Sequence, residues 1–252
     1  MDHRNLDSGG SRMVVLLRPY KMSGMVSTSD RLHNLMASDA EEIAPIYVVV
    51  PGGKKVAQYS PTIVGSTLSY SPDKDCDGNF TASKFQMNNN CYNYACRVAT
   101  NSFAQPGRKQ GFFLESEGGP TGPVTTRGAE MDGLIWIGRA EISDAQMRDS
   151  EGAYGSGHLV ALLISQADHD IGWTGDYHWV RCDNNSFSSW SQKDGGDQAS
   201  DRDFAGKKLR DPRRAIWKVN EGPIIEGNID DIKVKYDFYG FMFVPAGRID
   251  II

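Results

Sequence analysis

The sequence predicts an α+β fold in which a cysteine-bearing helix packs on an antiparallel β-meander. After three consecutive asparagines, apolar residues recur at steps of three and four from Cys91 to Ala99, which is typical of one helix face. Beyond His158, short apolar segments alternate with turn residues, as in a run of antiparallel strands. Apolar residues make up 39% of the 252 residues, which is enough for a packed core and excludes wholesale disorder.

The first forty residues differ from the rest, and we expect an uncommitted N-terminal arm over 1–40 followed by a single domain over 41–252. Within the arm the pattern indicates one short strand at 13–18 and one short helix at 29–37. Its only apolar run, Met13–Leu17, is shorter than the core of a signal peptide. We therefore expect no conventional secretion signal, and a protein that is either cytoplasmic or exported by a signal-less route.

The elements of the first half follow from apolar runs and turn residues. Residues 46–50 predict a buried strand closed by Pro51-Gly52-Gly53, residues 57–70 one or two short strands, and residues 71–79 a turn. The helix begins at Cys91 with an asparagine cap and is expected to end near Asn101. Residues 107–130 are rich in Gly, Pro and Thr, which predicts a long surface loop.

The second half predicts the meander. Strands are expected at 134–137, 158–165, 176–183, 187–192, 232–238 and 240–244, with a helical turn at 143–149 and a solvated loop over 193–214. If the turn after Asp183 closes a simple hairpin, Cys182 faces Phe187 and His178 faces Ser191.

Charge and hydropathy argue against two classes of protein, those that coat nucleic acid and those that span a membrane. The net charge is −5, and a protein that coats nucleic acid needs a surplus of cations, so we do not expect nucleic acid as a partner. No apolar run approaches the roughly 20 residues that span a bilayer. Seven cations lie between Arg202 and Lys218, a pattern that suits an anionic substrate, a lipid headgroup or nucleic acid, although a solvated loop explains it more simply.

Cys91 is the candidate nucleophile. The N-terminus of a helix carries partial positive charge and free N–H groups, which lower the pKa of a thiol placed there. The same N–H groups can bind the oxyanion of an acyl-transfer intermediate. Gln86 and Asn90, with Asn88 and Asn89, supply amides that would complete such an oxyanion hole. A buried, inert thiol that simply packs is the alternative.

His178 is the candidate base, because a thiolate nucleophile needs a group that returns a proton to the leaving group. It lies inside an aromatic and apolar strand, where a buried imidazole must find a polar partner. A third residue that orients the imidazole would come from Ser191, Gln192 or Asp194, or from the aspartates at 176, 203 and 211. A structural histidine with a satisfied hydrogen bond is the alternative interpretation.

Asn90-Cys91-Tyr92-Asn93-Tyr94-Ala95 resembles the start of the catalytic helix in papain-like cysteine hydrolases. His178 follows on a strand of a meander, in the order found in that superfamily and in its NlpC-type amidase branch. The resemblance covers roughly residues 84–215. It implies a papain-like or NlpC-like fold and a thiol-dependent hydrolase of peptide or amide substrates, with Cys91 as nucleophile and His178 as base.

Two groups of residues partly match metal sites, but we expect neither a cofactor nor a metal. Cys91, Cys96, Cys182 and His178 are zinc-type ligands, but the first two lie five positions apart on one helix and point in different directions. Residues 73–78 repeat the first half of a calcium loop, whereas Lys84 occupies the position where a bidentate glutamate is required.

The competing hypothesis for function is a non-catalytic structural or interaction protein, either a component of a particle or a degenerate enzyme-like domain. In that case the N-terminal arm, the 107–130 segment and the C-terminal tail are the expected contacts with a protein partner. The two hypotheses differ in one observable: catalysis requires Cys91 and His178 to lie within hydrogen-bond reach of each other.

Overall fold

The computed structural model describes residues 44–64, 87–139, 155–184, 186–220 and 233–252. All of them belong to one compact unit, Ala44–Ile252. The expected N-terminal arm with its strand and helix, the turn at 71–79 with its calcium-like segment, Gln86 and the helical turn at 143–149 lie outside the described residues.

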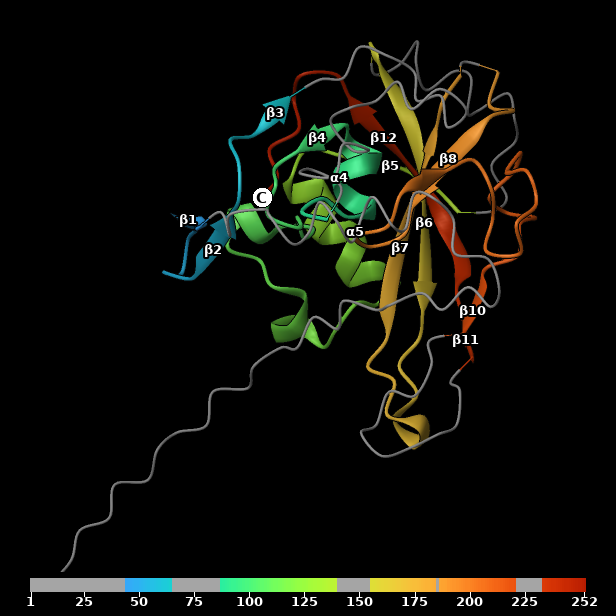
Figure 1. The fold of residues 1–252 in the computed structure, drawn as a ribbon, viewed down its shortest axis with the longest axis horizontal. Coiled ribbons are helices and arrows are strands. Elements are labelled where there is room, and N and C mark those ends of the chain that lie inside the picture. The colour runs from blue at the N-terminus through green and yellow to red at the C-terminus, as the bar shows by residue number, and fades with distance from the viewer. Residues whose placement is uncertain (1–43, 65–86, 140–154, 185, 221–232) are drawn as a thin grey trace, which may run out of the picture. The chain divides into compact units, whose positions relative to one another are not determined.

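The centre of the described fold is a six-stranded antiparallel sheet (Figure 1). Its strand order is β5-β12-β6-β7-β8-β9, so the C-terminal strand lies between β5 and β6. The strands are β5 (Ile135–Gly138), β12 (Asp237–Pro245), β6 (Gly157–Ser165), β7 (Asp176–Cys182), β8 (Trp190–Lys193) and β9 (Ala199–Ser200). The strands expected at 134–137, 158–165, 176–183 and 240–244 are thereby confirmed, because each apolar run there is long enough to fill a buried strand.

The expectation of an α+β fold of the papain-like or NlpC-like kind is wrong, because the described fold is mostly β. The cysteine-bearing helix α4 (Cys91–Cys96) has only six residues. Among the described residues, only α5 (Gly122–Met131) is a longer helix. Helix α4 ends because Arg97 adopts a left-handed conformation, with φ of 56°, and its N–H bonds back to Asn93 and Tyr94. Val98 and Ala99 continue the apolar spacing as strand β4 (Val98–Ala99), which pairs with β3 (Ile63–Val64).

The long loop expected over 107–130 is also wrong. The segment contains two 3₁₀ turns, η1 (Arg108–Gln110) and η2 (Leu114–Glu117), followed by α5. Proline is tolerated in the first turn of a helix, and Pro123 lies there. Gly122 packs against the ring of Tyr239 so closely that a Cβ would lie 2.1 Å from a ring carbon. The small residues of this segment therefore permit close packing and do not mark a loop.

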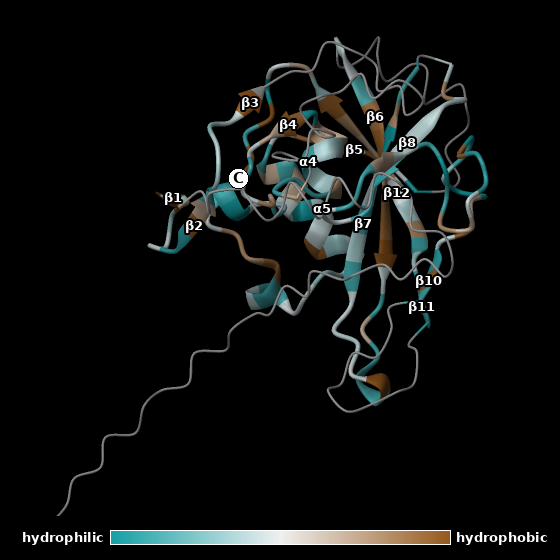
Figure 2. Ribbon diagram, viewed as in Figure 1, coloured by the Kyte–Doolittle hydropathy of each residue, from teal (hydrophilic) through white to brown (hydrophobic). Residues whose placement is uncertain are grey.

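Two hydrophobic cores cover the two faces of the sheet. On β7, Tyr177 and Trp179 point to the face that carries α4 and α5, and Val180 and Cys182 point to the other. Figure 1 shows the helices on one side of the sheet and the ribbon of β10 (Lys218–Asn220) and β11 (Lys233–Lys235) on the other. The most hydrophobic residues follow β6 and β12 through the middle of the sheet (Figure 2). Apolar residues at consecutive strand positions are thus explained by burial on both faces.

The expected hairpin register between β7 and β8 is wrong by several positions. Arg181 lies opposite Ser191, and Cys182 lies opposite Trp190. The turn is longer than a simple hairpin because the side chain of Asn184 accepts hydrogen bonds from the N–H groups of Ser188 and Ser189. The third strand therefore begins at Trp190 and not at residue 187.

The segment 193–214, expected to be a solvated loop, is partly buried. It contains β9, and the side chains of Asp201, Asp203 and Leu209 are buried in it. The carboxylate of Asp203 accepts hydrogen bonds from the N–H groups of residues 205, 207 and 216, which folds the segment back onto the sheet. No helix in the part of the chain that the structure describes is long and apolar enough to cross a membrane.

The first strand forms a separate two-stranded ribbon. Strand β1 (Ile46–Val49) pairs antiparallel with β2 (Lys55–Gln58) through a turn at Pro51–Gly53. The strand expected at 46–50 is thus confirmed, but its burial is not: Ile46, Tyr47 and Val49 are exposed. Val50 and Val56 anchor the ribbon by packing with Ile252, and Val48 and Phe113 lie against them.

Candidate functional site

The start of α4 is fixed by asparagine side chains. Asn90 is the N-cap, and its Oδ1 accepts the N–H groups of Tyr92 and Asn93, both at 3.1 Å. Asn93 completes a capping box by accepting the N–H of Asn90. The expected helix start at Cys91 is confirmed, and Cys91 is its first residue.

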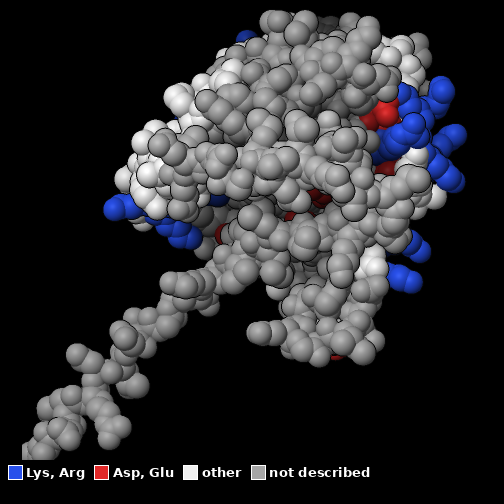
Figure 3. All heavy atoms as spheres, in the orientation of Figure 1, with Lys and Arg blue, Asp and Glu red and all other residues white. Residues whose placement is uncertain are grey.

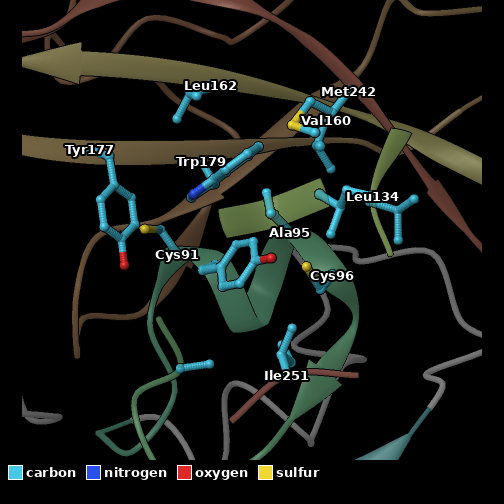
Figure 4. Packing of buried hydrophobic residues seen from close by; sticks show 14 of the residues in the cluster. Cys91, Ala95, Cys96, Leu134, Val160, Leu162, Tyr177, Trp179, Met242 and Ile251 are labelled. Atoms are coloured by element: carbon cyan, nitrogen blue, oxygen red, sulfur yellow. The ribbon is translucent and has the colours of Figure 1, made fainter. Parts of the chain in front are cut away.

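The Cys91 thiol is sealed in the core. Figure 4 shows it beside Tyr177 and Trp179, and it belongs to the buried cluster on the helix face of the sheet. Burial raises the pKa of Cys91 far above its usual value, and Asp176 raises it further, while the backbone of Trp179 and the charge of Lys193 act weakly in the opposite direction. The expected lowering of its pKa by the helix N-terminus does not occur, since the loss of solvation outweighs the dipole of a six-residue helix.

His178 lies in the core on the other face. Its ring packs against Phe204, Trp217 and Tyr236, with ring centroids 5.2–6.1 Å apart. Nε2 lies 2.9 Å from Oε1 of Gln192, whose own Nε2 donates to the carbonyl of Arg202. Burial lowers the pKa of His178, while Asp194 and the Gln192 hydrogen bond act to raise it. The imidazole is therefore a neutral ring with a satisfied polar partner.

The structure does not bring Cys91 and His178 together, because the sheet lies between them. Side chains on a strand alternate between its faces, so His178 points away from the side that carries Trp179 and the Cys91 thiol. Gln192, one of the expected orienting residues, does contact His178, and Asp194 acts on both groups through its charge. A nucleophile and its base must lie within hydrogen-bond reach, and these two residues occupy different cores.

Two of the asparagines expected to bind an oxyanion, Asn89 and Asn90, form hydrogen bonds within the fold. Nδ2 of Asn90 donates to the carbonyl of Ala104 at 2.7 Å. Nδ2 of Asn89 donates to Oδ1 of Asn101 at 2.9 Å, and its Oδ1 accepts the N–H of Asn101 at 2.9 Å. Asn89 and Asn90 are buried, so their amides hold the start of α4 against the following segment and are not directed at a substrate.

Sequence reasoning missed the buried cations on the helix face. Nζ of Lys193 donates to the carbonyls of Asn89 and Gly195, and burial lowers its pKa to about 7. Arg181 packs over the ring of Tyr94 at 4.1 Å and donates to its hydroxyl and to Asp183. The alternation along β7 was an available signal, because it places Arg181 on the same face as Tyr177 and Trp179.

A buried carboxyl at the C-cap of α5 was also missed. Oδ2 of Asp132 accepts the hydroxyl of Tyr92 at 2.9 Å and the N–H of Gly107 at 2.7 Å. Burial raises the pKa of Asp132 to about 7, against the lowering effect of both hydrogen bonds. This residue joins α4, the start of the 107–130 segment and α5.

The four zinc-type ligands do not form a site. Cys91 and Cys96 lie in one core, whereas Cys182 and His178 lie in the other. Within the described ranges, no group of three or more His, Cys, Asp or Glu side chains is placed to hold a metal ion.

Most of the cations between Arg202 and Lys218 are exposed. Figure 3 shows Lys and Arg on the side of the molecule that carries β8 and the segments beyond it. Some are neutralised locally: Lys208 pairs with Asp201, and Arg213 and Arg214 both approach Asp211. The exposed members are Arg202, Lys207, Lys208, Arg210, Arg214 and Lys218. Exposed ion pairs of this kind contribute little to stability, so this surface stays solvated and carries a net positive charge.

Comparisons with known proteins give one informative relative. No protein-family model matches the chain, and no solved structure matches it. Insoluble matrix shell protein 1 from Ruditapes philippinarum is 37% identical over 175 residues, which are 68% of this chain and 90% of the relative.

The relative corrects the expectation of a papain-like thiol protease. Its name is that of an insoluble matrix protein of a shell and not of a hydrolase, and the described fold is mostly β. An alignment of this identity over nine-tenths of the relative establishes common descent. This chain belongs to the same family as insoluble matrix shell protein 1.

Proposed function

We propose that this protein is a non-catalytic structural component of an insoluble extracellular matrix. The observation that carries the proposal is the relationship to a protein named for its place in the insoluble matrix of a shell, over nearly all of that relative's length. This is the structural alternative to the thiol hydrolase that the sequence also suggested.

The placement of the candidate catalytic groups supports the same proposal. The thiol of Cys91 is buried, which raises its pKa, and His178 is held in an aromatic cluster on the opposite face of the sheet. The amides of Asn89 and Asn90, which an oxyanion hole would need, are occupied by the Asn101 side chain and by the carbonyl of Ala104. These polar groups are therefore used in hydrogen bonds within the fold.

Extraction of the source tissue tests the proposal. We expect the protein to stay in the residue after washing with concentrated salt, chelator and mild detergent, and to dissolve only in denaturant. Recovery of the protein in the first aqueous extract would contradict a matrix role.

A second arm tests for thiol catalysis with purified full-length protein. The variants Cys91→Ser and Cys182→Ser form a matched pair, because both thiols are buried, on opposite faces of the sheet. A structural protein gives no labelling of Cys91 by an electrophilic thiol probe in the native state. Labelling of native Cys91, with an amide hydrolysis that is lost in Cys91→Ser and kept in Cys182→Ser, would restore the hydrolase.

A further inference from the structure

The outer edge of β1 is an unpaired strand edge. In the part of the chain that the structure describes, β1 pairs with β2 on one side and with no strand on the other. Exposed strand edges present rows of unpaired N–H and C=O groups, and natural proteins usually protect them with charges, bulges or covering segments. None of the residues from Ile46 to Val50 is charged.

The hydrogen-bond pattern of the ribbon shows which groups face this edge. The N–H of Val50 donates to the carbonyl of Lys54 at 3.0 Å, so Val50 bonds toward β2. Hydrogen-bonded and non-bonded positions alternate along an antiparallel pair. Val48 and Ile46 therefore also bond toward β2, and the N–H and C=O groups of Tyr47 and Val49 point to the free edge.

The side chains around these groups are apolar and open to solvent. Ile46 is 60% exposed, and Tyr47 and Val49 are each 62% exposed. Aromatic and β-branched residues are those that pair best across neighbouring strands. Tyr47 and Val49 share the outward face of the ribbon, while Val48 faces the small core formed by Val50, Val56 and Ile252.

We propose that this edge pairs with the same edge of a second copy of the chain, in an antiparallel register centred on Val48. Tyr47 of each copy then lies opposite Val49 of the other. These are the residues whose backbone groups point outward, and each such pair exchanges two N–H···O=C bonds. The two ribbons become one four-stranded sheet, β2-β1-β1-β2, related by a two-fold axis.

The positions of two prolines favour a second copy in this orientation. Pro45 and Pro51 each lie three residues from Val48, so in the antiparallel register Pro45 of one copy lies opposite Pro51 of the other. Pro45 and Pro51 lack the N–H needed to extend a ladder, so the pairing is confined to the five residues between them.

This inference deepens the proposed function and rests on it for its biological purpose, because a matrix component must associate. Its test uses purified full-length protein, so a negative result here is separate from the tissue extraction. Sedimentation velocity over a range of concentrations measures the mass. We expect the mass to rise from 27.8 kDa to twice that value with concentration, and a monomer at every concentration would overturn the pairing.

Two charge variants test the register. In Tyr47→Lys/Val49→Lys, lysines face each other at both cross-strand pairs, and we expect the dimer dissociation constant to rise at least about tenfold. In Tyr47→Glu/Val49→Lys, each glutamate faces a lysine of the other copy, and we expect dimerisation to recover. An unchanged dimer in the first variant, or no recovery in the second, would overturn the proposal.

The matched control is Tyr59→Lys/Ile171→Lys, which adds the same charge at two exposed apolar residues outside β1. It should dimerise like the wild type, and a loss of dimers in this control would overturn the assignment to β1. Amide hydrogen exchange supplies an independent measurement: we expect the N–H groups of Tyr47 and Val49 to exchange rapidly in dilute protein and slowly in concentrated protein. Protection in the dilute monomer would show that the chain covers its own edge, and would overturn the proposal.

Discussion

Asp132→Asn should change how the stability of this protein depends on pH. The Asp132 carboxyl is almost completely buried, and Oδ2 accepts hydrogen bonds from the Tyr92 hydroxyl and the Gly107 N–H. Its second oxygen, Oδ1, has no hydrogen-bond partner among the described residues. Burial raises the pKa of this carboxyl from 3.8 to about 7, so the folded protein holds it as the neutral acid through mildly acidic pH.

The size of the effect on the free energy of unfolding follows from the shift in the pKa of Asp132. Between about pH 4 and pH 7 the folded state binds a proton that the unfolded state has released, so the free energy of unfolding falls as pH rises. The slope is about 1.4 kcal/mol for each pH unit, and the full shift is worth about 4 kcal/mol. The contribution of Asp132 is fully present below pH 3.8 and is lost by the time pH has risen past about 7. An asparagine keeps an oxygen that accepts the same hydrogen bonds and does not ionise.

Urea unfolding of the wild type and Asp132→Asn between about pH 4 and pH 8 measures the difference. As pH rises across this range, we expect the free energy of unfolding of the variant, measured relative to the wild type, to increase by about 4 kcal/mol, with most of the change below pH 7. Tyr92→Phe is the companion variant, because it removes a donor that favours the ionised carboxylate and should move the window to higher pH. Parallel curves for wild type and Asp132→Asn would refute the reasoning.

Three further predictions concern the face of the sheet that carries α4. Burial lowers the pKa of Lys193 to about 7, so wild-type stability should rise between about pH 7 and pH 10, and Lys193→Met should abolish that rise in urea titrations at alkaline pH. Iodoacetamide should modify Cys91 at least about tenfold more slowly in native protein than in denaturant, as followed by peptide mapping; equal rates would contradict its burial. Asn93→Ala removes four buried hydrogen bonds and should lower the free energy of unfolding by about 3 kcal/mol or more. Asn93→Asp keeps the two bonds that the side-chain oxygen accepts, so it should lower the free energy of unfolding by less. A loss below about 1 kcal/mol for Asn93→Ala would show that these hydrogen bonds contribute little to stability.

The sequence was most informative where local chemistry decides the structure. The asparagine before Cys91 identified the start of α4, because a side-chain oxygen at that position satisfies the first free N–H groups. The apolar runs at 158–165 and 240–244 identified β6 and β12, which are neighbouring interior strands of the sheet, since an uninterrupted run of this length suits a strand buried on both faces.

Local chemistry did not reveal where α4 ends or that α5 exists. Arg97 takes a left-handed conformation that usually marks a glycine or asparagine, so no residue signalled the stop. Helix α5 contains Gly122, Pro123 and Gly128, which lower helix propensity, and its stability comes from tertiary packing against Tyr239 and the backbone of Pro106.

The side of the sheet on which His178 lies was the decisive unknown for function. Alternation shows that His178 and Trp179 point in opposite directions, but β7 is buried on both faces, so its sequence carries no contrast between inside and outside. Helix α4 packs on the side of the sheet that carries Trp179, and this packing is decided by contacts between residues far apart in the sequence. The pairing of nucleophile and base therefore depended on information that the strand sequence does not contain.

The two cores share their strands, and this has a consequence for how the protein melts. Consecutive residues of β6, such as Val160 and Ala161, belong to opposite cores, so losing the strand empties both at once. Heat should therefore disrupt the unit in a single calorimetric transition whose van't Hoff and calorimetric enthalpies agree. Opening one edge of such a strand would expose apolar side chains of both cores to water, so the shared strands oppose partial unfolding.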